Sequence, residues 1–132
     1  MALFGGEKRE ENNEALRAEI ERVGALSLDE LAAEAMAKGF GPGTPGADGL
    51  VLASNVSGAF VPGDTTRGLD QASLVEIDNI VAEGIQALEH AGLVRMIGAS
   101  DDAHNYSTYV KATRAGVAAL ESDSVAKALK GA

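Results

Sequence analysis

The chain has 132 residues and a formal net charge of −9 at neutral pH. A chain of this length normally folds as one domain, and its 45% hydrophobic residues can supply a single core. The absence of Cys excludes disulfides and thiolate chemistry, and the apolar start of the chain is too short for a signal peptide or a membrane span. The negative charge also disfavours an anionic membrane surface as a partner. We therefore expect a soluble, cytoplasmic domain with no membrane partner.

The first predicted helix covers residues 7–23, which are rich in strong helix formers. Leu16, Ile20 and Val23 recur on one side of it at helical spacing. This apolar side either packs on the core of its own chain or pairs with the first helix of a second copy, so a monomer and a homodimer both stay open. Residues 1–6 are expected to form a flexible end.

The second predicted helix begins near Leu28. Ser27 and Glu30 have the spacing of a capping box, in which the Ser hydroxyl accepts an amide of the first turn and the Glu carboxylate reaches back to the free amide of the Ser. Lys38 and Gly39 then provide a cationic last turn and a residue that permits the helix to stop.

Residues 39–69 contain eight of the sixteen Gly and all three Pro, but only three charged residues. This composition predicts an insertion loop without regular helix. Residues 50–52 and 59–61 form two short apolar runs, which are candidates for a small hairpin within the loop. A loop of this length is uncommon in a compact domain, so it is expected to be functional, disordered or inserted.

The third predicted helix begins at a second possible capping box, Ser73 to Glu76, and ends at Gly92. Its narrow apolar stripe consists of Leu74, Ile77, Val81, Ile85 and Leu88, and the last four of these are expected to be the most buried block of the molecule. Its outer face consists of Glu76, Asn79, Glu83, Gln86 and His90.

A two-stranded hairpin and a final helical region complete the chain. Residues 93–97 and 106–111 have the composition of strands and flank a polar turn. Thr113 is a suitable N-cap for the helical region, which is expected to break at 122–124. Residues 123–132 are expected to form a second flexible end.

This order of three helices, a hairpin and a helix resembles a winged helix-turn-helix domain. Residues 87–94 (ALEHAGLV) resemble the end of the third helix of such domains running into the wing. Residues 109–116 (YVKATRAG) resemble the second wing strand turning into the next helix, and the helix at 28–38 looks like the second helix of the family. The segment 39–69 replaces the short turn that usually joins the second and third helices. We expect an α+β, winged helix-like domain over residues 1–132, with a two-stranded wing, a C-terminal helix and a long insertion.

The resemblance implies that the exposed side of the third helix is the surface that enters the DNA major groove in the family. Asn79 and Gln86 on this side have the donor and acceptor geometry to read adenine. Residues 70–92 nevertheless contain five acidic residues and no Lys or Arg. This helix therefore offers no cations to displace the counterions of DNA. We predict a non-enzymatic regulatory or protein-interaction module whose DNA-reading face has become acidic and contacts a protein partner.

The alternative hypothesis is a DNA-binding transcription regulator, monomeric or dimeric, that contacts DNA through the wing and through Arg95, Lys111 and Arg114. Charge disfavours duplex DNA as a partner in this case too.

An enzyme is the third and least favoured hypothesis, and we predict no catalytic residues, no cofactor and no metal. Residues 41–46 match G-x-G-x-x-G, but they follow a helix and two of them are Pro, which lacks the amide that would hold a phosphate. Asp101, Asp102 and His104 form an incomplete ligand set in a polar turn.

Overall fold

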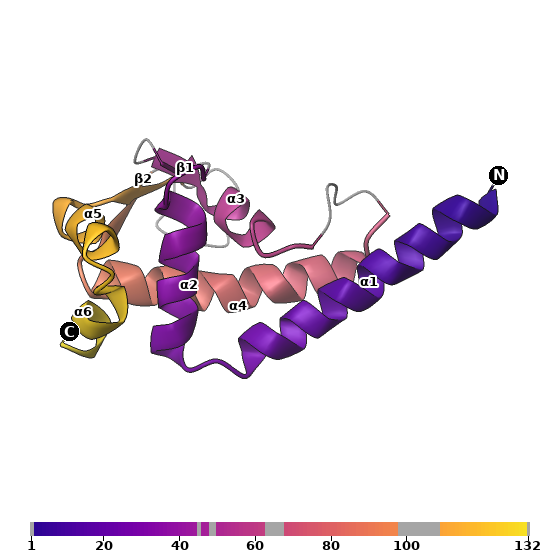
Figure 1. The fold of residues 1–132 in the computed structure, drawn as a ribbon, viewed down its shortest axis with the longest axis horizontal. Coiled ribbons are helices and arrows are strands. Elements are labelled where there is room, and N and C mark those ends of the chain that lie inside the picture. The colour runs from indigo at the N-terminus through magenta and orange to yellow at the C-terminus, as the bar shows by residue number, and fades with distance from the viewer. Residues whose placement is uncertain (1, 45, 48–49, 63–67, 98–108, 132) are drawn as a thin grey trace.

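The computed structural model describes residues 2–44, 46–47, 50–62, 68–97 and 109–131, and of residues 2–9 only the backbone. This part of the chain forms six α-helices and a three-stranded antiparallel sheet, so the predicted α+β class is confirmed (Figure 1). The helices are α1 (Ala2–Gly24), α2 (Leu28–Phe40), α3 (Ala53–Gly58), α4 (Gln71–His90), α5 (Arg114–Glu121) and α6 (Val125–Lys130). The strands are β1 (Leu50–Leu52), β2 (Val94–Ile97) and β3 (Tyr109–Ala112).

Helix α4 runs through the middle of the molecule, and α2 crosses it closely (Figure 1). Gly84 makes this close approach possible. A Cβ atom at this position would lie 3.2 Å from Cγ of Leu31 and 3.5 Å from the backbone of Ala32, both on α2. A larger side chain at this point of α4 would therefore push α2 away.

The apolar stripe of α4 is buried, as predicted. Ile77, Val81, Ile85 and Leu88 are each at most 2% exposed, whereas Leu74 is half-buried. Because the stripe recurs at helical spacing, its burial sets the rotation of α4 about its axis. None of the described helices combines the length and hydrophobicity needed to cross a bilayer.

Helix α1 packs on α4 through its C-terminal part, while its N-terminal part extends away from the other helices (Figure 1). Leu16 and Val23 are at most 1% exposed, and Ile20 is partly buried against the core. The apolar side of α1 thus packs on its own chain, one of the two expected arrangements. The helix begins at Ala2, so residues 2–6, within the end that we expect to be flexible, are helical.

The prediction that residues 39–69 contain no regular helix is wrong. Residues 39–40 complete α2, and β1 and α3 follow within the segment. The predicted hairpin is also wrong, because β1 pairs with β3 and not with residues 59–61. The reason is tertiary packing, which outweighs the Gly and Pro content of the segment. Its apolar side chains that belong to the core include Val51, Val56 and Phe60.

The sheet has three strands instead of the predicted two, in the order β1-β3-β2. Its buried row consists of Val51, Val110 and Met96. The next residue of the middle strand, Lys111, lies on the outer face between Leu50 of β1 and Arg95 of β2. The turn predicted between the two wing strands and the start of the second strand lie outside the described residues.

One of the two predicted capping boxes is present. The amide of Glu30 donates to the Ser27 hydroxyl at 3.2 Å, and the Ser27 amide donates to the Glu30 carboxylate at 3.1 Å. The second box is wrong, because α4 begins at Gln71 with Asp70 as its N-cap. Ser73 lies inside the first turn, is 7% exposed, and donates its hydroxyl hydrogen to the Asp70 carboxylate at 2.8 Å.

The C-terminal region contains two short helices separated at 122–124, as predicted. Thr113 caps α5, since its hydroxyl accepts the amide of Gly116 at 3.1 Å. Residues 125–130, within the end that we expect to be flexible, form α6. Val125 and Leu129 of α6 are at most 8% exposed and belong to the core, where α6 packs on α2.

Replacing Ile85 with Ala should lower the free energy of unfolding by about 2–5 kcal/mol, because the change removes a fully buried side chain from the stripe. The matched control is Val75→Ala on the same helix, where the side chain is 46% exposed, and it should change stability by less than about 0.5 kcal/mol. Denaturant unfolding measures both values. Equal small losses in the two variants would contradict the described rotation of α4.

Candidate functional site

Two exposed surfaces contain the residues that the sequence singles out. We name the first the acidic stripe; it consists of Glu76, Asn79, Glu83, Gln86 and His90 of α4. All five side chains are exposed, and their spacing of three and four residues places them on one side of the helix. The acidic stripe therefore runs along most of the length of α4.

Contacts with neighbouring helices fix the position of α4 and hence of the acidic stripe. The Ser57 hydroxyl of α3 donates to the Asp78 carboxylate at 2.7 Å, which attaches α3 to one flank of α4. At the N-terminus of α4, the amide of Asp70 donates to the side-chain oxygen of Asn13 on α1 at 2.8 Å. The stripe is thus carried by a helix that α1, α2 and α3 hold in place.

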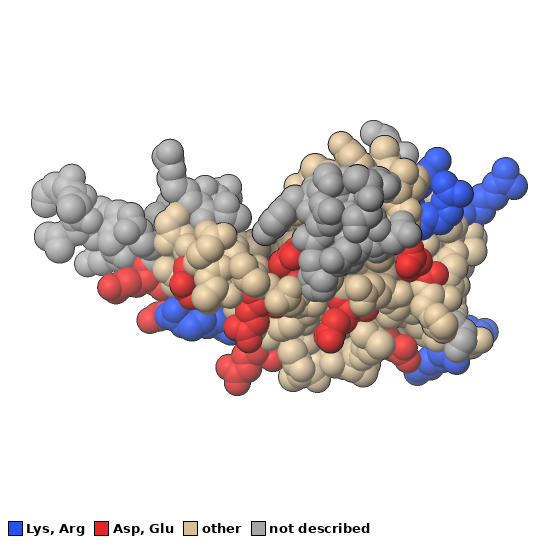
Figure 2. Space-filling view, turned by 180° about the vertical axis from the view of Figure 1, so that it is seen from behind, with Lys and Arg blue, Asp and Glu red and all other residues tan. Residues whose placement is uncertain are grey.

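The acidic stripe has no Lys or Arg on its own helix. Residues 71–90 include four acidic residues and no Lys or Arg. Within the described part of the chain, the ion pairs lie within α1, within α2 or between these two helices, and they include no residue of the stripe. Figure 2 shows acidic side chains along the middle of one face of the molecule, and a group of basic side chains near the end opposite to the N-terminus of α1. The carboxylates of the stripe therefore face solvent.

The C-terminal half of the acidic stripe borders an open groove of about 600 Å³. Glu83, Gln86 and His90 form one side of it. The opposite sides come from the start of α2 and from α6, where Leu28 and Leu129 line the groove. Leu28 is 53% exposed, so the groove offers an apolar contact next to the polar stripe.

The second surface, which we name the basic cluster, consists of Arg95, Lys111 and Arg114. Arg95 and Lys111 are directly opposite each other on β2 and β3, and Arg114 is the first residue of α5. All three are exposed and line a shallow depression of about 300 Å³. The structure thus brings the three predicted wing residues together.

Apolar side chains accompany the basic cluster on the outer face of the sheet. Leu50, Ile97 and Tyr109 are 48%, 38% and 42% exposed, and all belong to the strands that carry or flank Lys111 and Arg95. This apolar outer face of the sheet is not among the sites predicted from the sequence. The signal for it was the alternation of buried and exposed residues along β2 and β3, which identifies the outward side chains.

The acidic stripe and the basic cluster are separate surfaces. The groove beside the stripe lies between α4, α2 and α6, while the depression at the cluster lies on the sheet and the start of α5, and the two share no lining residue. The molecule therefore presents opposite charges on different elements.

The chemical motifs of the sequence form no further site in the described residues. No group of three His, Asp or Glu there is placed to hold a metal ion. Asp101, Asp102 and His104 lie outside the described part of the chain. The described residues of the segment 41–46 follow α2 and precede β1, an order that differs from the strand and helix of a dinucleotide site.

An ion-pair network that sequence reasoning missed joins α1 to α2. Arg22 donates to Glu19 at 2.7 and 2.8 Å, and to Glu34 of α2 at 3.0 and 2.6 Å. Lys38 lies 3.8 Å from Glu19 and 3.7 Å from Glu34. The hydrogen bonds from Arg22 lower the pKa of both carboxyl groups, and the same bonds raise the pKa of Arg22. The spacing of Glu19 and Arg22 was a visible signal for half of this network.

The lowered carboxyl pKa values make the network dependent on pH. Its stabilisation is present above the unfolded-state pKa, about 4.3, and is lost as the pH falls through the lower folded-state values. Glu34→Gln should therefore lower the free energy of unfolding at pH 7 by no more than about 1 kcal/mol, because the Arg22 side chain is 44% exposed, and the difference from wild type should shrink below pH 4. Denaturant unfolding at pH 7 and pH 3 measures this difference.

The control for this experiment is Glu21→Gln, an exposed residue of α1 outside the network. A loss in Glu34→Gln that stays the same at both pH values would show that charge is not its cause.

Comparison with known proteins identifies no relative. No protein-family model, curated protein or solved structure matches the chain. The functional proposal therefore rests on the described residues alone.

Proposed function

We propose that the chain is a non-enzymatic regulatory or protein-interaction module on a winged helix-like scaffold, and that the acidic stripe is its protein-contact face. The arrangement of α3, α4 and the strands supports the scaffold. Helix α3 packs on the flank of α4, and β2 follows directly after the C-terminal end of α4 and pairs with β3. The sequence resemblance implies a third helix that leads into two paired wing strands, and α4, β2 and β3 have this order. We therefore assign α4 to the position of the DNA-reading helix in the proposed scaffold.

The observation that carries the functional proposal is the charge of the exposed side of α4. Glu76 and Glu83 lie on this side, and the helix has no Lys or Arg to balance them. Placed in a major groove, these carboxylates would face phosphates and would release no counterions. The same carboxylates attract a cationic partner and raise the rate of its association.

The groove beside the stripe indicates the kind of partner. A segment that fills it would meet Leu28 and Leu129 on one side and Glu83 on the other. An amphipathic segment with apolar residues on one side and Lys or Arg on the other matches this combination. We therefore propose a basic, amphipathic protein segment as the partner of the acidic stripe.

The double variant Glu76→Gln/Glu83→Gln tests this proposal. It removes two negative charges from the stripe without changing the size of the side chains, so the amount of partner captured from an extract of the native host should fall severalfold. Quantitative mass spectrometry of the captured proteins measures the change.

The matched control is Glu10→Gln/Glu14→Gln, which removes two exposed charges from α1. Capture should stay at the wild-type level in this control. The same set of proteins at the same level with wild type and the stripe variant would contradict a role for the acidic stripe.

The basic cluster favours a second candidate function, a DNA-binding regulator that contacts the duplex through the wing. Arg95, Lys111 and Arg114 lie close enough together to line one depression, and no acidic residue lines it with them. Three cations can displace about three counterions, so binding through them alone would show a log–log salt slope of about −2.7.

A salt titration with a random DNA duplex distinguishes the two functions. The proposed module should bind weakly at about 150 mM salt, and the stripe variant should bind this duplex more tightly because repulsion has been removed. Tight, sequence-specific binding by the wild type that is lost on truncation of Asn79 or Gln86 would replace the first proposal with the DNA-binding regulator.

A further inference from the structure

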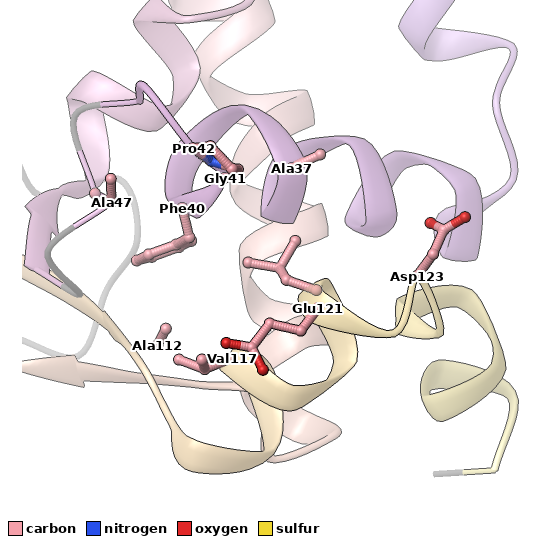
Figure 3. Close-up of a pocket in the computed structure, with 11 residues that line it drawn as sticks. Ala37, Phe40, Gly41, Pro42, Ala47, Ala112, Val117, Glu121 and Asp123 are labelled. Atoms are coloured by element: carbon pink, nitrogen blue, oxygen red, sulfur yellow. The ribbon is translucent and has the colours of Figure 1, made fainter.

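A pocket lies on a different part of the molecule, between the C-terminal end of α2, the turn that follows it, and α5 (Figure 3). Its volume is about 470 Å³, within the range of small-molecule sites. Neither the acidic stripe nor the basic cluster contributes a residue to its lining. The pocket is therefore a third surface, distinct from the acidic stripe and from the basic cluster.

The wall formed by α2 and its following turn is fixed by backbone hydrogen bonds. The amide of Gly46 donates to the carbonyl of Gly39 at 2.8 Å, and the Thr44 hydroxyl donates to the carbonyl of Gly41. A Cβ atom at position 46 would lie 2.9 Å from the ring of Phe40, so the turn is packed tightly on the end of α2. This side of the pocket is formed before any ligand binds.

The opposite wall is fixed by the way in which α5 ends. Asp123 has a φ of 52°, in the left-handed region that ends many helices. Its amide donates to the carbonyl of Leu120 at 3.2 Å, and the amide of Ser124 donates to the carbonyl of Ala119 at 2.8 Å. These two bonds hold the end of α5 and place Asp123 at the edge of the pocket.

The chemistry of the pocket combines an apolar surface with negative charge. Phe40, Val117 and Leu120 line it, and Val117 is 44% exposed. Among the described residues of the lining, the charged ones are Glu121 and Asp123, and none is Lys or Arg. Within the described part of the chain, neither carboxylate forms an ion pair.

The two carboxylates take different places around the apolar surface. Figure 3 shows the carboxylate of Glu121 extending along the pocket toward Val117 and Ala112, on the side that faces Phe40, whereas Asp123 lies at the other end. A ligand that covers Phe40 and Val117 would thus bring its polar end close to Glu121. An anionic end would be repelled there, and a neutral one would leave the carboxylate partly desolvated and unpaired.

We propose that this pocket binds a small organic cation, an ammonium group attached to an apolar or aromatic body. The body covers Phe40 and Val117, and the ammonium group pairs with Glu121, while Asp123 adds to the negative potential. This inference does not depend on the protein partner of the acidic stripe, because the two surfaces share no residue.

Three probes with one apolar body and three different end groups test the proposal: 4-phenylbutylammonium, 4-phenylbutan-1-ol and 4-phenylbutyrate. Dissociation constants are measured at pH 7 from the methyl NMR signals of Val117 and Leu120 as each probe is added. The ammonium probe should bind saturably and about fivefold more tightly than the alcohol, the size of effect expected from a partly exposed ion pair, and the carboxylate probe should bind most weakly.

A double variant and a control variant test whether the two carboxylates cause the preference for the ammonium probe. Glu121→Gln, combined with Asp123→Asn, should reduce the preference for ammonium over alcohol to less than twofold and leave the affinity for the alcohol unchanged. Asn is chosen because it tolerates the left-handed conformation at position 123. The control Glu83→Gln, which removes a carboxylate from the acidic stripe, should leave all three affinities unchanged.

Three results would overturn the proposal. The first is equal affinity of the wild type for the ammonium and alcohol probes, which would show that the carboxylates do not select the ligand. The second is saturable binding that shifts the signals of Leu28 and leaves those of Val117 unchanged, which would place the site in the other groove. The third is no saturable binding of the ammonium probe at millimolar concentration, which would show that the pocket does not take this class of ligand.

Discussion

The close crossing of α2 and α4 at Gly84 is the constraint on which the other elements depend. A Cβ atom at this position would already lie 3.2 Å from the Leu31 side chain, so the two helices cannot approach further or accept a larger residue without moving apart. Because α2 covers this side of α4, the side that contains Asn79 and Gln86 is turned outward. The crossing also positions the C-terminal end of α2, and α5 packs against the same helix near Gly116, where an added Cβ atom would lie 2.9 Å from Cε of Met36.

Three surfaces of the molecule differ in charge and in shape. The acidic stripe on α4 borders a groove with an exposed Leu28, the basic cluster lies on the outer face of the sheet, and the pocket with Glu121 lies between α2 and α5. A helix that enters a DNA groove gains affinity from Lys and Arg residues that displace counterions. Helix α4 has no Lys or Arg, whereas the basic cluster lies on β2, β3 and the start of α5, which is why we propose a protein partner for α4. The groove beside the acidic stripe and the pocket with Glu121 share no lining residue, so the proposed protein partner and the proposed organic cation do not compete for one.

Sequence reasoning succeeded where the decisive interaction is local. The capping box at Ser27 and the helical spacing of the α4 stripe each depend on residues a few positions apart, and both are present in the structure. The predictions from sequence were wrong or incomplete where contacts with a distant segment determine the structure. Residues 50–52 form a strand because β3, near the other end of the chain, pairs with them, and the Arg22–Glu34 ion pair depends on the angle between two helices. The exposure of the acidic stripe was likewise predictable from periodicity, whereas the groove and the pocket are each built from three separate elements that no local pattern connects.

The reactivity of single introduced cysteines tests most directly whether α4 turns its acidic side to solvent. The chain has no Cys of its own, so each variant has one reactive thiol. Asn79→Cys and Gln86→Cys should react with a maleimide reagent about as fast as the unfolded protein does. Val81→Cys and Ile85→Cys should react at least about 100-fold more slowly, because labelling them requires local opening of the core. Equal rates at Val81→Cys and Asn79→Cys, in variants that circular dichroism shows to be folded, would contradict the account.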